Sequence, residues 1–349
     1  MQERLNEIFE KHRPAYSGTI LVKQADSTLL SAAAGLAHRG FNVTSTIDTR
    51  FDTASVTKVF TATAVLQLVQ HGLLRLDDKI ADIIDLRGTA ISELVTLEHL
   101  MTHTSGIADD ADEESGEDYS ALFVEKPNYS LRDCVDFLPQ FVNKPPNFAP
   151  GTDVRYNNCA FILLGLAIER ITQTPYREYI THNVFDACGM THSQFCAMDE
   201  VNANVAEGYI LKPGTDSTSK WCKSIYSYPP VGTADSGAYT TVGDLDIFLR
   251  AVLQGRLLNP RHSALLFRPH CEHSREHRHG KWRTGYAFEF VEDGNGEPLC
   301  MFKEGLNAGV EAMCAYFPRA DITVNLLANT HGTLFPLFRE LQALLLKNE

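Results

Sequence analysis

The sequence has no apolar run long enough to cross a bilayer, so we expect no membrane-spanning helix. Positive charge is also scarce, because 31 lysines and arginines are set against 44 aspartates and glutamates and the formal net charge is −13. This balance argues against nucleic acid and against an anionic membrane as partners. The eight cysteines contain no Cys-x-x-Cys pair, which favours reduced, buried thiols.

The chain also lacks the pattern of a secretory signal, because residues 1–7 open with charges and are typical of an amphipathic helix. Together with reduced thiols, this predicts a cytoplasmic location; an export signal trimmed from the chain is the alternative. There is no internal repeat, low-complexity linker, paired metal-ligand motif or Gly-x-Ser-x-Gly elbow. The 349 residues, of which 44% are hydrophobic, are enough for a large core.

What the sequence does contain is a Ser-x-x-Lys tetrad, from Ser55 to Lys58, followed by Tyr156-Asn157-Asn158. If the tetrad opens a helix, the spacing of three puts serine and lysine on one face, one turn apart. A serine hydroxyl is a poor nucleophile until a neighbouring base removes its proton. The run after the lysine is apolar and Ala-rich, as in a buried helix, and burial makes a neutral lysine amine more accessible. The two motifs therefore predict an acyl-transfer enzyme.

Further segments occur around these motifs in a fixed order. They are residues 97–107 (LEHLMTHTSGI), Ala149-Pro150-Gly151-Thr152 and residues 235–241 (DSGAYTT). With them, the sequence from about Ser17 to about Gly332 resembles the serine β-lactamase and penicillin-binding-protein-like hydrolases. The resemblance is to the class C β-lactamase-related branch, which includes D-aminopeptidases and family VIII-type carboxylesterases.

The resemblance implies a role for each motif residue. Ser55 would be the nucleophile, and Lys58 its proton acceptor or electrostatic partner. Tyr156 would relay protons to the leaving group, its phenolate made accessible by Lys58 and a second cation. Asn158 would hold Lys58 and a substrate amide.

The family's third motif is Lys/His-x-Gly on an edge strand that faces the nucleophile, and Lys303-Glu304-Gly305 corresponds to it. Lys303 would be the second cation near the tyrosine. Gly305 would let substrate approach the strand closely because it has no side chain. The oxyanion hole would then be the backbone N–H groups of Ser55 and Leu306.

Glu304 departs from the family pattern, in which the middle residue is usually small or a threonine. Its carboxylate could pair with Lys303, or it could bind a substrate amine. On either interpretation, carboxylate-bearing β-lactams would be poorer substrates. The third alternative is that Glu304 points away from the pocket, as alternate strand residues do.

Three other features have a structural and a functional interpretation. The acidic segment 109–118 is expected to be a solvated, mobile surface segment, with a gate beside the active-site mouth as the alternative. His103 is expected to be a structural histidine bonded to backbone, and a catalytic role is the less favoured alternative. The third feature is a basic surface loop, expected from a cluster of residues that could alternatively, though less favourably, bind zinc. The cluster consists of His262, His270, Cys271, His273, His277 and His279.

Strand patterns occupy both ends of the chain, at 17–24, 28–37, 286–291, 299–302, 311–317 and 322–329. Helical patterns occupy 55–71, 158–172 and 333–347. We therefore expect an α/β (α+β) fold, β-lactamase/transpeptidase-like, with an antiparallel sheet built from both termini, flanking helices and a mostly helical lobe. One domain, 1–349, would comprise a sheet lobe (about 1–50 and 280–349) and a helical lobe (about 51–279), with the active site in the seam.

The predicted function is that of a serine hydrolase acting on an ester, amide or β-lactam-like bond through an acyl-serine intermediate. We expect no cofactor, no metal and a small-molecule or short peptide-like substrate, without specifying an oligomeric state. Within the family, a D-stereospecific peptidase or an acyltransferase is the alternative. Outside enzymes, the alternative is a catalytically weak penicillin-binding or sensor protein on the same scaffold.

Overall fold

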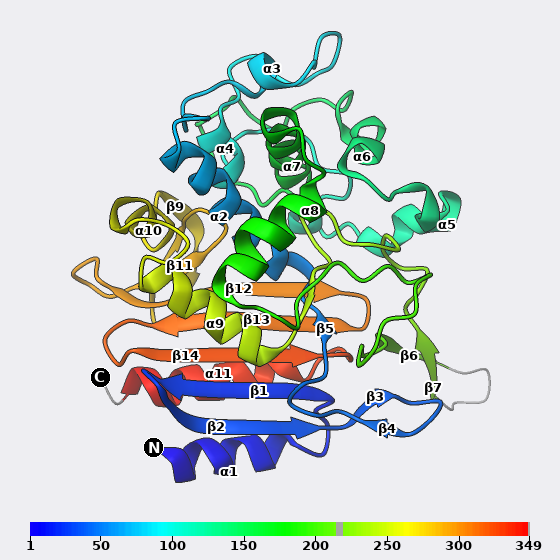
Figure 1. Cartoon of the computed structure of the whole chain (residues 1–349), viewed down its shortest axis with the longest axis vertical. Helices are drawn as coiled ribbons and strands as arrows, with labels where there is room; N and C mark the ends of the chain where they lie inside the picture. The colour runs from blue at the N-terminus through cyan, green and yellow to red at the C-terminus, as the bar shows by residue number, and fades with distance from the viewer. Residues whose placement is uncertain (214–218, 348–349) are drawn as a thin grey trace.

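The computed structural model describes residues 1–213 and 219–347 and contains a large antiparallel sheet that joins the two ends of the chain (Figure 1). Its eight strands lie in the order β2-β1-β14-β13-β12-β11-β10-β9. Their bounds are β1 (Gly18–Gln24), β2 (Ser27–Ala34), β9 (Cys271–His277), β10 (Gly280–Thr284), β11 (Glu289–Glu292), β12 (Pro298–Asn307), β13 (Val310–Phe317) and β14 (Ile322–Ala328). The pairing of β1 with β14, from Gly18 opposite Ala328 to Gln24 opposite Ile322, confirms a sheet built from both termini.

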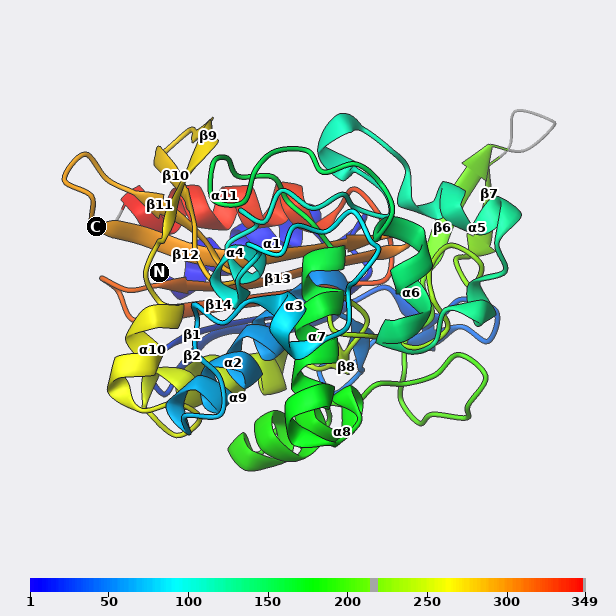
Figure 2. The ribbon, with the colours of Figure 1, turned by 90° about the horizontal axis from the view of Figure 1, so that it is seen from above.

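Helices cover both faces of this sheet (Figure 2). The N-terminal helix α1 (Gln2–His12) and the C-terminal helix α11 (Leu334–Lys347) lie on one face, and α9 (Val242–Leu253) packs on β1 and β14 from the other. Leucines recur at helical spacing along α11 and are buried against the sheet. Because both faces are covered, every residue of β14 is buried.

The middle of the chain forms the helical lobe around α2 (Thr57–Gln70) and α7 (Cys159–Thr172). In α2 every residue from Thr57 to Leu68 is buried, because helices surround it on all sides. The other α-helices are α3 (Ile80–Ile83), α4 (Leu97–Met101), α5 (Leu122–Glu125), α6 (Cys134–Phe141), α8 (Tyr176–Ile180) and α10 (Pro260–Leu266). Short strands complete the chain: β3 (Leu36–His38), β4 (Val43–Thr44), β5 (Phe51–Asp52), β6 (Tyr209–Pro213), β7 (Ser219–Lys223) and β8 (Tyr239–Thr240).

The sheet takes its last strands from Cys271 onward, so the lobe boundary expected at about residue 280 falls within the β9–β10 hairpin. One expectation about the sheet needs correction. The strand of the third motif, β12, is not at the edge of the sheet, because β11 lies beside it. The pairing with β11 ends at Phe302, however, so the segment from Lys303 to Asn307 is paired to β13 alone among the described residues. That segment therefore behaves locally as the expected edge.

Of the helices in residues 1–213 and 219–347, none combines the length and the apolar character that crossing a membrane requires.

Candidate active site

Ser55 lies in a single 3₁₀ turn, Ala54–Val56, immediately before α2. The residue before it, Ala54, has a left-handed φ of 43°, which is uncommon for a residue with a side chain. A hydrogen bond from the preceding strand holds the turn in place: the N–H of Ala54 donates to Asp52 Oδ1 at 2.7 Å. Burial of Asp52 raises its pKa to about 7, against the effect of that hydrogen bond. This constrained turn packs on β12 and leads directly into α2, so it holds Ser55 between the strand and the helix.

Lys58 lies one turn further along and is fully buried. Its amine donates to Ser55 Oγ at 3.0 Å, to Asn158 Oδ1 at 2.7 Å and to the Asp235 carbonyl oxygen at 2.7 Å. Burial lowers the pKa of Lys58 to about 8, although the negative charge of Asp235 opposes this shift. A neutral amine in contact with the serine hydroxyl is therefore accessible near neutral pH, as the motif predicts.

Tyr156 contacts the same hydroxyl from a second direction, its O–H donating to Ser55 Oγ at 2.7 Å. The amines of Lys58 and Lys303 lie 5.1 and 4.7 Å from the centre of its ring. The expectation that these cations make the phenolate accessible is wrong. Burial, followed by the negative charge of Glu113, raises the pKa of Tyr156 well above its ordinary value. Tyr156 is therefore a neutral hydrogen-bond donor in this structure.

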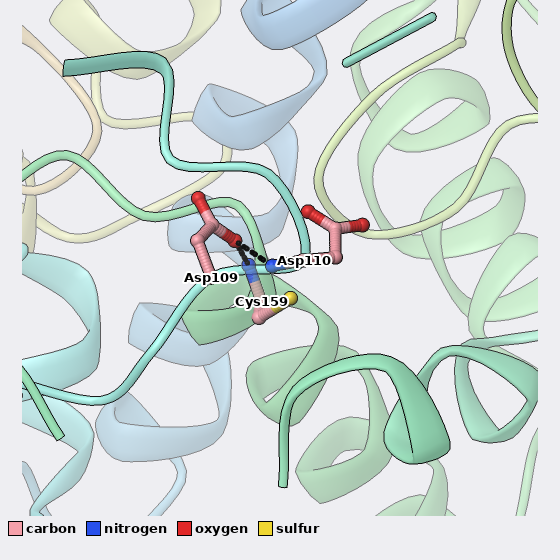
Figure 3. A group of neighbouring side chains, drawn as sticks. All are labelled: Asp109, Asp110 and Cys159. Carbon is pink, nitrogen blue, oxygen red and sulfur yellow. Dashed lines mark hydrogen bonds between the residues drawn. The ribbon is translucent and has the colours of Figure 1, made fainter. Parts of the chain in front are cut away.

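Asn158 is held at the N-terminus of α7 by a carboxylate from the acidic segment. Asp109 accepts from the backbone N–H of Asn158 at 2.8 Å. It also accepts from the backbone N–H of Cys159 at 3.0 Å (Figure 3). These bonds satisfy N–H groups that a helix N-terminus otherwise leaves unpaired. The Asn158 side chain donates in turn to Glu113 Oε1 at 2.9 Å, while its oxygen binds Lys58.

The prediction of a solvated surface segment at 109–118 is therefore wrong for its first part. Asp109 and Asp110 are buried, and Glu114 accepts from the backbone N–H of Tyr156 at 3.1 Å. Glu113 and Glu114 line the pocket above Ser55. This is the position expected under the alternative interpretation of the segment, a gate beside the active-site mouth. Sequence reasoning misjudged it because a run of acidic residues is usually solvated, whereas here backbone N–H groups take up the carboxylates.

Two clusters contain residue types that can ligate a metal ion. Asp109, Asp110 and Cys159 bring ligand atoms within 4.8 Å of one another (Figure 3). Both oxygens of Asp109 already accept backbone N–H groups, and burial beside Asp109 raises the pKa of Asp110 well above its ordinary value. A carboxylate in a helix cap beside a protonated carboxyl group is a structural unit and a poor cation site.

The histidine-rich segment forms the hairpin of β9 and β10, not the expected surface loop. His270 stacks on Tyr286 with ring centres 3.7 Å apart, and His262 bonds Asn259 at 2.9 Å. The side chain of His273 lies outside the described residues, and no metal-ligating group forms among the histidines that are described.

His103 accepts from the backbone N–H of Asn157 at 3.2 Å, in keeping with the structural role expected of it. Its ring also packs on Tyr156, with centres 4.7 Å apart.

The third motif lies against the nucleophile turn. Gly305 is packed so closely that an added Cβ would lie 2.2 Å from the Thr53 carbonyl oxygen and 3.2 Å from Ser55 N. Lys303 is buried, and the carboxylate recorded beside it is Glu289 on β11, with Nζ and Oε1 3.5 Å apart. Strand alternation places Glu304 on the opposite side of β12, where it is exposed at the pocket rim. Lys303 therefore pairs with Glu289 on the neighbouring strand β11, and not with Glu304 as one alternative expected.

Sequence reasoning missed Glu113, Glu289 and the carbonyl of Asp235. Asp235 opens one of the noted motifs and Glu113 lies in the acidic segment 109–118, so signals existed there, but Glu289 lies in no noted motif. One open pocket collects most of the predicted site residues together with these glutamates. Its lining is Ser55, His103, Glu113, Glu114, Val154, Tyr156, Trp282, Thr284, Ala287, Glu289, Lys303, Glu304 and Leu306.

Known proteins resemble this chain in sequence and in fold. A family model described as Beta-lactamase matches residues 6–348. Penicillin-binding protein 4 of Amycolatopsis lactamdurans is 32% identical over 220 residues, which cover 62% of this chain and 54% of that protein. The chain spans about half the length of the curated relatives it matches.

Among solved structures, a penicillin binding protein from Bacillus halodurans has a TM-score of 0.89 and 34% identity, covering 97% of this chain and 99% of that one. A D-stereospecific amidohydrolase from Streptomyces sp. has a TM-score of 0.77 and 21% identity, covering 95% and 94%. The second likeness is one of fold alone. These matches confirm the expected β-lactamase/transpeptidase-like fold.

Proposed function

The chain belongs to the beta-lactamase family, and on that basis we propose that it is a serine hydrolase acting on an ester, amide or β-lactam-like bond through an acyl-Ser55 intermediate. The observation that carries the proposal is the position of Ser55 Oγ, 3.0 Å from Lys58 Nζ and 2.7 Å from the Tyr156 hydroxyl. A nucleophile in contact with a base of lowered pKa is the arrangement that acyl transfer requires. The catalytic unit would be the single domain expected from the sequence.

In the proposed reaction, the neutral amine of Lys58 takes the proton of Ser55 as Oγ bonds to the substrate carbonyl carbon. The oxygen of that carbonyl becomes negative and is stabilised by the backbone N–H groups of Ser55 and Leu306. The close packing of Gly305 on Ser55 supports this pairing, because it brings the two backbones together. Tyr156 then passes its phenolic proton to the leaving group and is reprotonated through Lys58. In the second half of the reaction, neutral Lys58 takes a proton from the water that attacks the acyl carbon, and returns it to Ser55 Oγ as the bond between Oγ and the acyl carbon breaks.

Two narrower functions fit the same machinery. The amidohydrolase fold supports an amidase, or a D-stereospecific peptidase, and an acyltransferase would differ only in the acceptor that replaces water. The relatives described as penicillin-binding proteins support the non-enzymatic alternative, in which Ser55 is acylated but released slowly. Substrates would be small molecules or short peptide-like chains, which the open pocket above Ser55 can admit.

The test is turnover of p-nitrophenyl butyrate by the natural chain, by Ser55→Ala and by Ser27→Ala, which removes an exposed hydroxyl on β2. We expect turnover by the natural chain and Ser27→Ala but not by Ser55→Ala. Intact-protein mass after incubation with a fluorescent penicillin identifies a stable adduct. An adduct on Ser55 without turnover would select the penicillin-binding alternative. Equal activity of Ser55→Ala, or neither turnover nor adduct, would refute the proposed nucleophile.

A further inference from the structure

The electrostatic partner of Lys303 sets the charge of the pocket. Lys303 is buried, and its one carboxylate partner within 4.0 Å among the described residues is Glu289, at 3.5 Å. Glu289 projects from β11, at the strand position opposite Phe302. A lysine that faces a substrate pocket would otherwise attract a substrate carboxylate. With Glu289 beside it, the charge of Lys303 is compensated before any ligand arrives.

The rest of the pocket reinforces this effect. Its lining contains four carboxylates, those of Glu113, Glu114, Glu289 and Glu304, and one ammonium group, that of Lys303. Glu289 compensates the charge of Lys303, and Glu113 accepts from the neutral side-chain amide of Asn158 and so keeps its negative charge at the pocket. A pocket of this kind repels an anionic ligand and attracts a cationic one.

The two sides of the nucleophile can also be distinguished. Glu289 lies beside Lys303, and the amine of Lys303 lies 4.7 Å from the centre of the ring of Tyr156, the residue that delivers a proton to the leaving group in the proposed mechanism. A charge preference should therefore act first on the part of the substrate that departs from the carbonyl. Leu306, exposed at the same rim, offers apolar contact for the body of that group.

We propose that Glu289 is a specificity-determining residue, which neutralises Lys303 so that the site favours substrates with a protonated amine on the leaving-group side and disfavours those with a carboxylate there. This inference rests on the proposed function. The favoured substrates would be esters or amides of amino-bearing alcohols or amines, including short peptides with a free basic group.

Three butyrate esters of matched shape test it, those of 4-(aminomethyl)phenol, 4-methylphenol and 4-(carboxymethyl)phenol. Each kcat/KM is divided by the rate of hydroxide hydrolysis of the same ester, which removes differences in leaving-group reactivity. For the natural chain we expect the cationic ester to exceed the anionic one by about tenfold or more. Raising the salt concentration should reduce that ratio.

Glu289→Gln keeps the shape of the side chain and uncovers Lys303, so the anionic-to-neutral ratio of kcat/KM should rise by about tenfold. Glu304→Gln, at the exposed rim, should raise the anionic-to-neutral ratio by a smaller factor. It replaces Glu289→Gln as the test variant if that protein does not fold. The matched control is Glu297→Gln, which removes one charge from the exposed turn between β11 and β12 and should leave the ratio unchanged.

Two kinds of failure are distinguishable. If the neutral ester is hydrolysed in a Ser55-dependent way but the natural chain treats all three charges alike, or Glu289→Gln leaves the ratio unchanged, this inference is overturned and the proposed function stands. If none of the three esters is hydrolysed in a Ser55-dependent way, the proposed function falls and this inference falls with it.

Discussion

The amine of Lys58 and the hydroxyl of Ser55 lie 3.0 Å apart at the start of a helix whose side chains are buried almost throughout. Burial is what connects the two residues chemically. The same helix on the surface would bring them equally close, but its lysine would stay protonated and could not accept a proton. The predictions below test this link and the packing that maintains it.

The pH dependence of turnover should report the pKa of Lys58. Because the base must be neutral to accept the proton of Ser55, kcat/KM for a neutral ester should rise with pH and reach half its maximum near the value of about 8. Tyr156 should add no second deprotonation below that, since its pKa is raised. A pH–rate profile with the neutral ester measures this. An inflection well below 7 would contradict Lys58 as the base, and Lys58→Met should lose about 100-fold or more in kcat.

Gly305→Ala should disable the site by a steric route. The new Cβ would lie 2.2 Å from a backbone oxygen of Thr53, so β12 and the nucleophile turn must move apart. We expect kcat/KM to fall about 100-fold and the free energy of unfolding to fall by about 1–3 kcal/mol. The control is Gly294→Ala, where a Cβ meets nothing within 4 Å. Full activity of Gly305→Ala would show that the strand does not bear on catalysis.

Asp109→Ala should show that the acidic segment supports the catalytic residues. It removes the acceptor for the N–H groups of Asn158 and Cys159, so the free energy of unfolding should fall by about 1–2 kcal/mol. Because Asn158 binds Lys58, kcat should fall as well while KM changes little. Glu125→Ala, which removes an exposed carboxylate a short distance beyond the same segment, is the control. Chemical denaturation and steady-state kinetics on both variants decide whether the cap positions the site.

Asp52→Asn tests whether the buried carboxyl group beside the nucleophile turn lowers the stability of the folded chain once it is ionised. Burial raises the pKa of Asp52 from 3.8 to about 7, so the folded chain binds a proton there that the unfolded chain has lost. The stabilisation is complete below pH 4 and disappears as the pH rises through 7, a change of up to about 4 kcal/mol. Asparagine keeps the acceptor for Ala54 without the charge.

The variant should therefore gain stability over the natural chain at pH 8 and gain little at pH 4, as measured by denaturant unfolding at both values. The exposed Asp26→Asn is the control, because a surface carboxylate carries no burial penalty. An equal difference at both pH values would mean that Asp52 does not titrate on folding.

Much of the site was predictable because its parts are local. The Ser-x-x-Lys spacing fixes the Ser55–Lys58 distance through helix geometry alone, and the order of later motifs pointed to Tyr156, Asn158 and Gly305. The terminal strands were equally clear, since β-branched alternation near Gly18 and Ile322 reads as strand in any context.

Tertiary structure decided the electrostatics. Whether Tyr156 is a phenolate, whether Asp109 is solvated and which carboxylate compensates Lys303 all depend on burial and on neighbours distant in sequence, such as Glu113 and Glu289. A pKa sums desolvation and charges over all nearby groups, and only the folded chain sets those distances. The sequence by itself determined the spacing of the groups that we propose do the chemistry, because a helical turn is local; the fold determined their burial and their neighbours, and through these their charge.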